Sequence, residues 1–277
     1  MRKAKALKWK LLFYVVAAGI LIFLAIFGEK IAPHDPYEVN VLAIDRPPGG
    51  EFLLGTDNLG RDLFSRILAG TRSSIVAMLV ITVCTLAIGT GIGAAAGYFG
   101  GVSDAVIQKI LLIFQSFPGQ VMAIAVAGVL GAGLGNAAVA LIAIGWTNYA
   151  RMTRSMVLRI KESGYIKAAK LYGSSPISII FRHILPNISS AIFVYAMVSL
   201  SRVILEISSL SFLGLSAKPP TPEWGFMMNE GRKVLMTAPW QALVPGVAIL
   251  ITVIIFNRLG DSIQDYMDFK SGQMTEE

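Results

Sequence analysis

Long runs of apolar residues recur along the whole chain, and they constrain its fold more than any other feature. The first run, Leu11–Phe27, holds no charged residue, and others follow near 74–98, 105–130, 136–156, 188–213 and 240–257. A helix needs about 20 such residues to cross the hydrocarbon core of a bilayer. The composition, 55% hydrophobic and 15% charged, also differs from soluble domains, in which about 25% of residues are charged. The pattern predicts an all-α integral membrane protein with six transmembrane helices.

The first apolar run has an alternative interpretation as a secretory signal peptide, because a basic segment precedes it. No small-x-small cleavage site follows, since Gly28-Glu29-Lys30-Ile31 is a poor match to Ala-x-Ala. We therefore expect Leu11–Phe27 to be a retained first transmembrane helix.

The distribution of Lys and Arg predicts how the spans are oriented. With the N-terminus inside, the inner segments hold 15 of the 24 cations and the outer segments hold 8. Cytoplasmic loops are typically the more basic ones, so we expect both termini in the cytoplasm. The net charge of +7 therefore needs no nucleic acid as a partner. The expected parts are a cytoplasmic N-terminus (1–10), a first transmembrane helix (11–27), an extracytoplasmic segment (28–72), a five-helix core (73–260) with a polar loop at about 159–186, and a cytoplasmic tail (261–277).

Glycines recur every fourth residue in the second apolar run. Such a stripe lets another helix approach closely. A phosphate-binding loop is the alternative, but no strand precedes the glycines and no Lys-Ser/Thr follows them. We expect a helix-packing stripe formed by Gly89, Gly93, Gly97 and Gly101. Two prolines, Pro118 and Pro245, should kink or break the third and sixth helices.

The most polar inner segment, 151–186, contains signals for two helices. A helix over Arg159–Tyr172 would end at Gly173, and Ser175 can cap a second helix that has Pro176 at its first position. This unit could fit into a groove of a partner protein, or it could be a solvated loop with snorkelling cations. The residues alone leave both readings open.

Two charged residues, Arg202 and Glu206, lie inside the fifth apolar run. Their spacing, i and i+4, permits an ion pair on one helix. Charges within a membrane usually face the interior of a helix bundle or an aqueous cavity. The pair could line a pathway, or it could order the packing near the end of the helix.

Few residues with metal-binding or catalytic chemistry are present. The chain has one cysteine, Cys84, and two histidines, His34 and His183, which excludes a multi-Cys zinc pattern and a His-rich metal site. The spans contain no HExxH motif and no nucleophile and base pair. We therefore expect no catalytic site, no metal site and no enzymatic activity in this chain.

The inner loop resembles the EAA loop of binding-protein-dependent ABC importer permeases. The resemblance is carried by Lys167-Ala168-Ala169, Gly173 and His183-Ile184-Leu185-Pro186 at the motif's spacing. Lys167 stands where the motif has Glu, and His183 stands where it has Ile. The ending Arg182–Asn187 is typical of the dipeptide/oligopeptide/nickel branch.

Other blocks resemble the same branch, from about residue 10 to residue 268. They are Leu54-Gly55-Thr56-Asp57, Gly60–Arg66, Gly97–Gly101 with Asp104, Lys109 and Pro118, Leu205–Leu215, and Pro222-Glu223-Trp224-Gly225. The resemblance implies a type I ABC importer permease fold in a bacterial-type cell membrane.

The resemblance also implies partners and site residues. The chain would pair with a second homologous permease subunit through glycine-lined and other helix faces. Two cytoplasmic ATP-binding subunits would dock on the loop, and an extracytoplasmic solute-binding protein would deliver cargo. This chain would bind no cofactor, while ATP and Mg are used by the partner ATPases. The implied coupling residues are Tyr165, Lys167, Ala168, Ala169, Gly173, Ser174 and Pro186, within a coupling helix at 165–173.

The cargo implied by the resemblance is a small peptide or a nickel chelate. Within the branch, the blocks Gly128–Asn136 and Trp146–Met152 are somewhat more similar to nickel-type subunits. A self-sufficient channel or a membrane scaffold is the alternative function, and it predicts transport without ATP.

Overall fold

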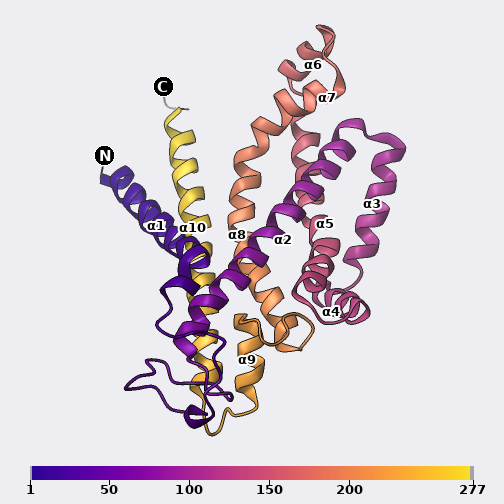
Figure 1. The fold of residues 1–277 in the computed structure, drawn as a ribbon. Coiled ribbons are helices and arrows are strands. Elements are labelled where there is room, and N and C mark those ends of the chain that lie inside the picture. Colours follow the sequence, from indigo (N-terminus) through magenta and orange to yellow (C-terminus); the bar gives the residue numbers. More distant parts are fainter. Residues whose placement is uncertain (1, 275–277) are drawn as a thin grey trace.

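The computed structural model describes residues 2–274 and consists of helices joined by short connections and one long outer segment (Figure 1). Met1 of the expected N-terminal segment and residues 275–277 of the expected tail lie outside the described residues. The described part contains no strand, only two isolated bridges. The helices are α1 (Arg2–Ile31), η1 (Val41–Ala43), α2 (Leu63–Phe99), α3 (Gly101–Gln115), α4 (Gly119–Leu130), α5 (Leu134–Ile160), α6 (Gly164–Leu171), α7 (Pro176–Ile179), η2 (Ile180–Ile184), α8 (Leu185–Phe212), α9 (Trp224–Arg232) and α10 (Trp240–Met274).

Within residues 2–274, four stretches of helix are long and apolar enough to cross a membrane: 5–31, 63–99, 176–212 and 240–269. A fifth is reached if the bent pair α3 and α4 counts as one span. The remaining long helix, α5, falls outside this group, and it carries Asn148 and Arg154 among its apolar residues. The all-α prediction is confirmed. The apolar helices support four of the six expected spans, or five if the bent pair is one span.

The expected break at Pro118 is present. α3 ends at Gln115, α4 begins at Gly119, and their axes meet at 86°. Proline lacks the N–H that a helix needs and disfavours helical geometry in the residue before it. By contrast, α10 continues through Pro245, so this proline does not end the helix.

Three of the glycines expected to form a packing stripe bring α2 against α5 of the same chain. A Cβ atom on Gly89, Gly93 or Gly97 would collide with α5, in the last case with Val157 Cβ at 2.9 Å. Gly101 lies beyond the end of α2, with a positive φ of 58° and open space around it. The expectation that this stripe contacts a second permease is therefore wrong for these three glycines, because α5 already occupies the face.

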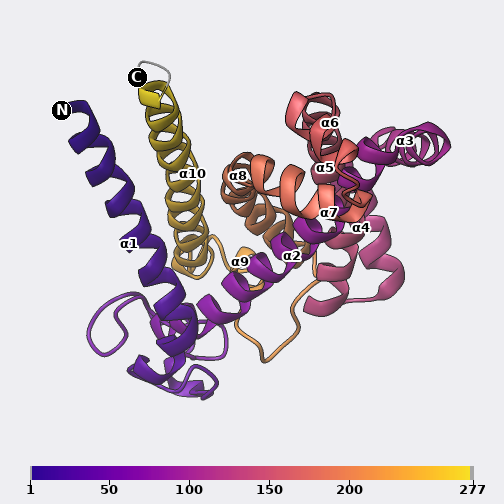
Figure 2. The same cartoon turned by 90° about the horizontal axis from the view of Figure 1, so that it is seen from above.

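The two ends of the helix bundle differ in what they carry. The N- and C-terminal ends of the described chain lie at the same end as α6 and α7, whereas the outer segment with η1, and α9, lie at the opposite end (Figure 1). Viewed from above, α1 and α10 stand to one side of α8, and α3 to α7 stand on the other (Figure 2). The main hydrophobic core includes Ile75, Met78 and Ile204, and it joins α1, α2, α4, α5, α8, α9 and α10.

An ionic network fastens the outer segment to α9. The Arg61 guanidinium lies 2.6 Å from Asp57 and 3.4 Å from Glu230, and Arg66 lies 3.3 Å from the same Asp57. Both arginines are almost fully buried. Burial raises the pKa of Glu230 above its usual value, against the opposing effect of the two arginines. Buried charges of this kind are tolerated because each has oppositely charged partners.

A second set of contacts lies at the start of α9, where Glu223 is fully buried. Its carboxylate accepts hydrogen bonds from the backbone N–H groups of Gly225 and Phe226, at 3.0 and 2.9 Å, and so caps the helix. The Ser74 hydroxyl of α2 lies 3.4 Å from the same carboxylate. Trp224 is also buried and donates its indole N–H to the Ile67 carbonyl at 3.2 Å. These contacts hold α9 against α2.

Replacing Glu223 with Gln should change how stability depends on pH. Burial raises the pKa of Glu223, so the folded state binds this proton more tightly than the unfolded state does. The contribution of this proton to the free energy of unfolding is complete below the ordinary glutamate pKa of about 4.3. It is lost as the pH rises through the raised pKa of Glu223. We expect the melting temperature of E223Q, relative to the unsubstituted protein, to improve as the pH rises from about 4.3 through the raised pKa of Glu223. Thermal unfolding in detergent measures this, and parallel profiles would contradict it.

The control for this prediction is Glu38→Gln, because Glu38 is exposed in the outer segment. E38Q should follow the pH profile of the unsubstituted protein.

Candidate functional site

A stripe of polar side chains runs along one face of α8 inside the span. Its members follow each other at spacings of four and three residues, which places them on the same side of a helix. They are Tyr195, Ser199, Arg202, Glu206 and Ser209.

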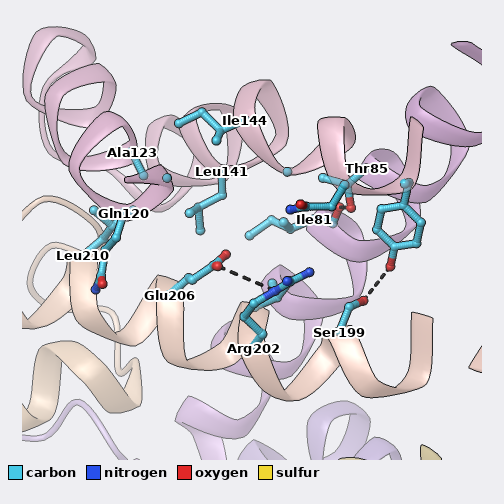
Figure 3. A pocket seen from close by; sticks show the side chains of 15 residues that line it. Ile81, Thr85, Gln120, Ala123, Leu141, Ile144, Ser199, Arg202, Glu206 and Leu210 are labelled. Atoms are coloured by element: carbon cyan, nitrogen blue, oxygen red, sulfur yellow. Dashed lines mark hydrogen bonds and ion pairs between the residues drawn. The ribbon is translucent and has the colours of Figure 1, made fainter. Parts of the chain in front are cut away.

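The middle of this stripe borders a cavity of about 70 Å³ between α8, α5, α4 and α2. Figure 3 shows Arg202 and Glu206 extending from α8 toward the helices that carry Gln120 and Leu141. Asn148 and Tyr149 of α5 line the same cavity. The volume suffices for a few water molecules. Two of the polar residues of α5 thus face the cavity, whereas Arg154 of the same helix pairs with Asp104 of α3.

The ion pair within the cavity is loose. Arg202 Nε lies 3.8 Å from Glu206 Oε1, which is beyond hydrogen-bond distance, and both side chains are partly exposed. Arg202 donates one hydrogen bond, to the Tyr195 hydroxyl at 3.3 Å, and its guanidinium lies 6.0 Å from the Tyr195 ring centroid. Among the described residues, Glu206 accepts no hydrogen bond. Other groups of the described chain therefore take up little of the hydrogen-bonding capacity of these two charges.

The hydroxyls beside this pair are fully engaged within the protein. Tyr149 and Ser199 form a buried hydrogen bond of 2.5 Å between α5 and α8, and the Tyr149 ring meets the Tyr195 ring edge to face. This arrangement fixes one wall of the cavity. It also leaves Arg202 and Glu206 as the charged groups of the cavity that remain available to a ligand.

The inner loop folds differently from the expected continuous helix over 159–172. α5 ends at Ile160, three residues intervene, and α6 begins at Gly164. The prediction of one helix is therefore wrong, because the chain turns at 161–163, where the Ser163 N–H bonds to the Ile160 carbonyl. The helix stop at Gly173 is confirmed, since Gly173 has a φ of 78° and the Ser174 N–H bonds to the Ala169 carbonyl. The cap at Ser175 with Pro176 following is also confirmed.

The loop is attached to the bundle by a second hydrophobic core. Ile166 of α6, Ile179 of α7 and Ile184 of η2 are completely buried in it, together with Val157 of α5. The η2 segment is a turn of π-helix that leads directly into α8. This core holds α6 and α7 against the neighbouring ends of α2, α5 and α8.

The expected coupling residues lie around α6. The Tyr165 hydroxyl accepts a 2.7 Å hydrogen bond from the Asn187 side chain. Lys167 lies 3.5 Å from Glu162, and both are exposed. Ala168, Ala169 and Ser174 are half-buried, Gly173 is exposed, and Pro186 lies in the first turn of α8. The structure thus places these residues in one region, and Arg202 and Glu206 in another, farther along α8.

Two further residues stand out at the tip of this loop. Leu171 and Tyr172 have exposed fractions of 89% and 90%. Large apolar side chains that project from a small helical unit are typical of a docking surface. The expected coupling helix at 165–173 includes both residues, but neither is among the coupling residues that the motif at Ala169 and Gly173 implies.

Comparisons with known proteins all identify membrane components of transport systems. Residues 87–272 match the family described as "Binding-protein-dependent transport system inner membrane component". The chain is 41% identical over 262 residues to the glutathione transport system permease protein GsiD of Pectobacterium atrosepticum, covering 92% of this chain and 86% of that protein. It is 38% identical to the dipeptide transport system permease protein DppC of Haemophilus influenzae, covering 92% and 88%. It is 32% identical to the nickel transport system permease protein NikC of Escherichia coli K12, covering 94% of each.

The fold also resembles a solved structure. The MetNI methionine ABC transporter in inward-facing conformations matches with a TM-score of 0.59 at 19% identity, covering 73% of this chain and 96% of that chain. At this identity the match concerns the fold alone.

Proposed function

Because the chain belongs to the family of binding-protein-dependent transport system inner membrane components, in its dipeptide, oligopeptide and nickel branch, we propose that it forms half of the translocation pathway of an ATP-driven importer. It is a multi-pass membrane protein. The proposed pathway passes the cavity at Arg202 and Glu206, and the proposed contact with the motor is the loop around α6.

One observation carries this proposal. The helical stretch 176–212 runs without interruption from the loop to the cavity, so a force on the loop reaches the polar stripe through one continuous helix. The loop itself is held to the bundle by buried Ile166, Ile179 and Ile184. A solvated loop without a partner would need neither this core nor the exposed Leu171 and Tyr172.

The proposed assembly follows from the family. It contains this chain, a second homologous permease subunit, two cytoplasmic ATP-binding subunits and an extracytoplasmic solute-binding protein. ATP and Mg are used by the ATP-binding subunits, and this chain binds no cofactor. In this assembly α5 and the bent pair α3 and α4 complete six spans, and both termini and α6 lie in the cytoplasm.

The proposed cargo is a small peptide or a nickel chelate. The relatives named above are permeases of glutathione, dipeptide and nickel systems. All of these cargoes carry charge, which is consistent with a charged pair inside the span.

The experiment that tests the proposed function is reconstitution of the complete importer in proteoliposomes. We expect the ATP-binding subunits to co-purify with this chain and uptake to require ATP. A substitution that removes ATP hydrolysis in the partner subunits should abolish uptake. The alternative, a self-sufficient channel or membrane scaffold, would leave transport or conductance unchanged by that substitution, and such a result would overturn the proposal.

A further inference from the structure

We propose that Arg202 and Glu206 form a recognition site for a zwitterion of dipeptide size, with Arg202 contacting the carboxylate of the cargo and Glu206 contacting its ammonium group. This inference rests on the proposed function and names the chemical class of cargo. The two residues then serve to bind cargo, and their role is not purely structural.

The first support is the unused bonding capacity of the pair. A guanidinium has five N–H donors, and a carboxylate has about four acceptor positions. Arg202 uses one donor within the described chain, at 3.3 Å, and Glu206 forms no hydrogen bond there. A charge within a membrane is costly unless water, a partner or a ligand satisfies it. Both charges border the same cavity, so a ligand in that cavity reaches both.

The second support is the contrast with ion pairs that hold this protein together. Arg61 contacts Asp57 at 2.6 Å and is almost fully buried. The Arg202 and Glu206 pair is separated by 3.8 Å and partly exposed (Figure 3). Such a pair loses little when its two members turn toward another ligand.

The third support is the spacing of the two charges. Residues one helical turn apart have Cβ atoms about 5–6 Å from each other. Two extended residues span about 7 Å, so the two charged ends of a dipeptide lying along α8 come within reach of both side chains once these turn away from each other. A bare metal cation carries no group for Arg202. The cavity of about 70 Å³ is smaller than a dipeptide, so it must widen before the cargo enters, and Arg202 and Glu206 then separate from each other.

The first test uses neutral variants in the reconstituted importer with alanyl-alanine as cargo. R202Q and E206Q should each lower the initial rate of ATP-dependent uptake about tenfold or more, because a charge-assisted hydrogen bond to the cargo is lost. The double variant R202Q/E206Q should transport no better than either single variant. If the pair were structural, removing both charges would leave no unpaired charge, and recovery of uptake in the double variant would overturn the proposal.

A matched control comes from an ion pair away from the cavity. Lys10 of α1 lies 3.0 Å from Asp265 of α10, and both are exposed. K10Q, D265N and their combination should transport within about twofold of the unsubstituted chain, as expected for an exposed pair.

The second test measures binding directly and does not require a transport-competent variant. Asn148 lines the cavity, and the native Cys84 is replaced by Ser. In the N148C importer, alanyl-alanine should slow labelling by a maleimide, whereas its C-terminal amide and its N-acetyl derivative should not. Adding R202Q should remove the protection.

The outcomes distinguish the two proposals. Equal protection by the amide, no protection by alanyl-alanine, or protection by a nickel–histidine chelate alone would overturn the zwitterion site. In those cases the unsubstituted importer would still take up its own cargo in an ATP-dependent manner. Failure of the proposed function would appear as uptake without ATP or as absence of the ATP-binding subunits.

Discussion

Replacing Gly93 with Leu should prevent α2 from packing against α5 and should remove most correctly folded protein. A Cβ atom at this position already collides with the Ala150 carbonyl oxygen and lies 2.9 Å from Thr153 Cβ. Overpacking costs about 1–3 kcal/mol where side chains can move, and here the obstacle is backbone. We expect the melting temperature to fall by about 10 °C or more in detergent, with little monodisperse protein in size-exclusion chromatography.

The matched control is Gly91→Leu on the same helix. Gly91 is exposed, and a Cβ atom at this position would have no atom within 4 Å other than those of its own helix. G91L has the same loss of glycine and the same added volume, so it should retain nearly normal stability. Equal destabilisation by both variants would show that helix propensity, and not the contact with α5, is responsible.

Replacing both Leu171 and Tyr172 with Asp should abolish transport without harming the fold. Both side chains are almost fully exposed at the tip of the inner loop, so the substitution removes no buried contact. If this tip docks on the ATP-binding subunits, losing two apolar anchors and adding two charges should weaken the association about 100-fold or more. Co-purification of the ATP-binding subunits and ATP-dependent uptake measure the effect.

The control for this pair is Met236→Asp. Met236 is 95% exposed in the connection that follows α9, at the opposite end of the bundle from α6. M236D should retain the ATP-binding subunits. If L171D/Y172D also retains them, the docking surface lies elsewhere.

The arrangement of the helices could be predicted from sequence where one residue decides the outcome. Pro118 cannot donate a hydrogen bond, and the chain breaks there, between α3 and α4. Gly173 takes a left-handed conformation at the end of α6. The break between α5 and α6 had a weaker signal, because Ser163, a residue type favoured at the start of a helix, precedes Gly164 but no proline interrupts residues 161–163.

The candidate site could be predicted only in part. The i, i+4 spacing indicated that Arg202 and Glu206 share a helix face, and both line one cavity. Gln120 and Asn148 could not be assigned to that cavity, because they come from α4 and α5 and only tertiary packing brings them there. The helix that packs on the glycine stripe could likewise not be predicted. Small residues indicate that another helix approaches closely, but they do not indicate which helix it is.

The uninterrupted helix from residue 176 to residue 212 has a geometric consequence. At 1.5 Å per residue, Arg202 lies about 39 Å along the axis from the start of this helix. If the rod pivots near α7, a rotation of about 5° displaces Arg202 sideways by about 3 Å. That displacement exceeds the 2.5 Å between the Tyr149 hydroxyl of α5 and the Ser199 hydroxyl of α8, so a modest change of angle at the α7 end suffices to break the contacts that α8 makes with α5 across the cavity.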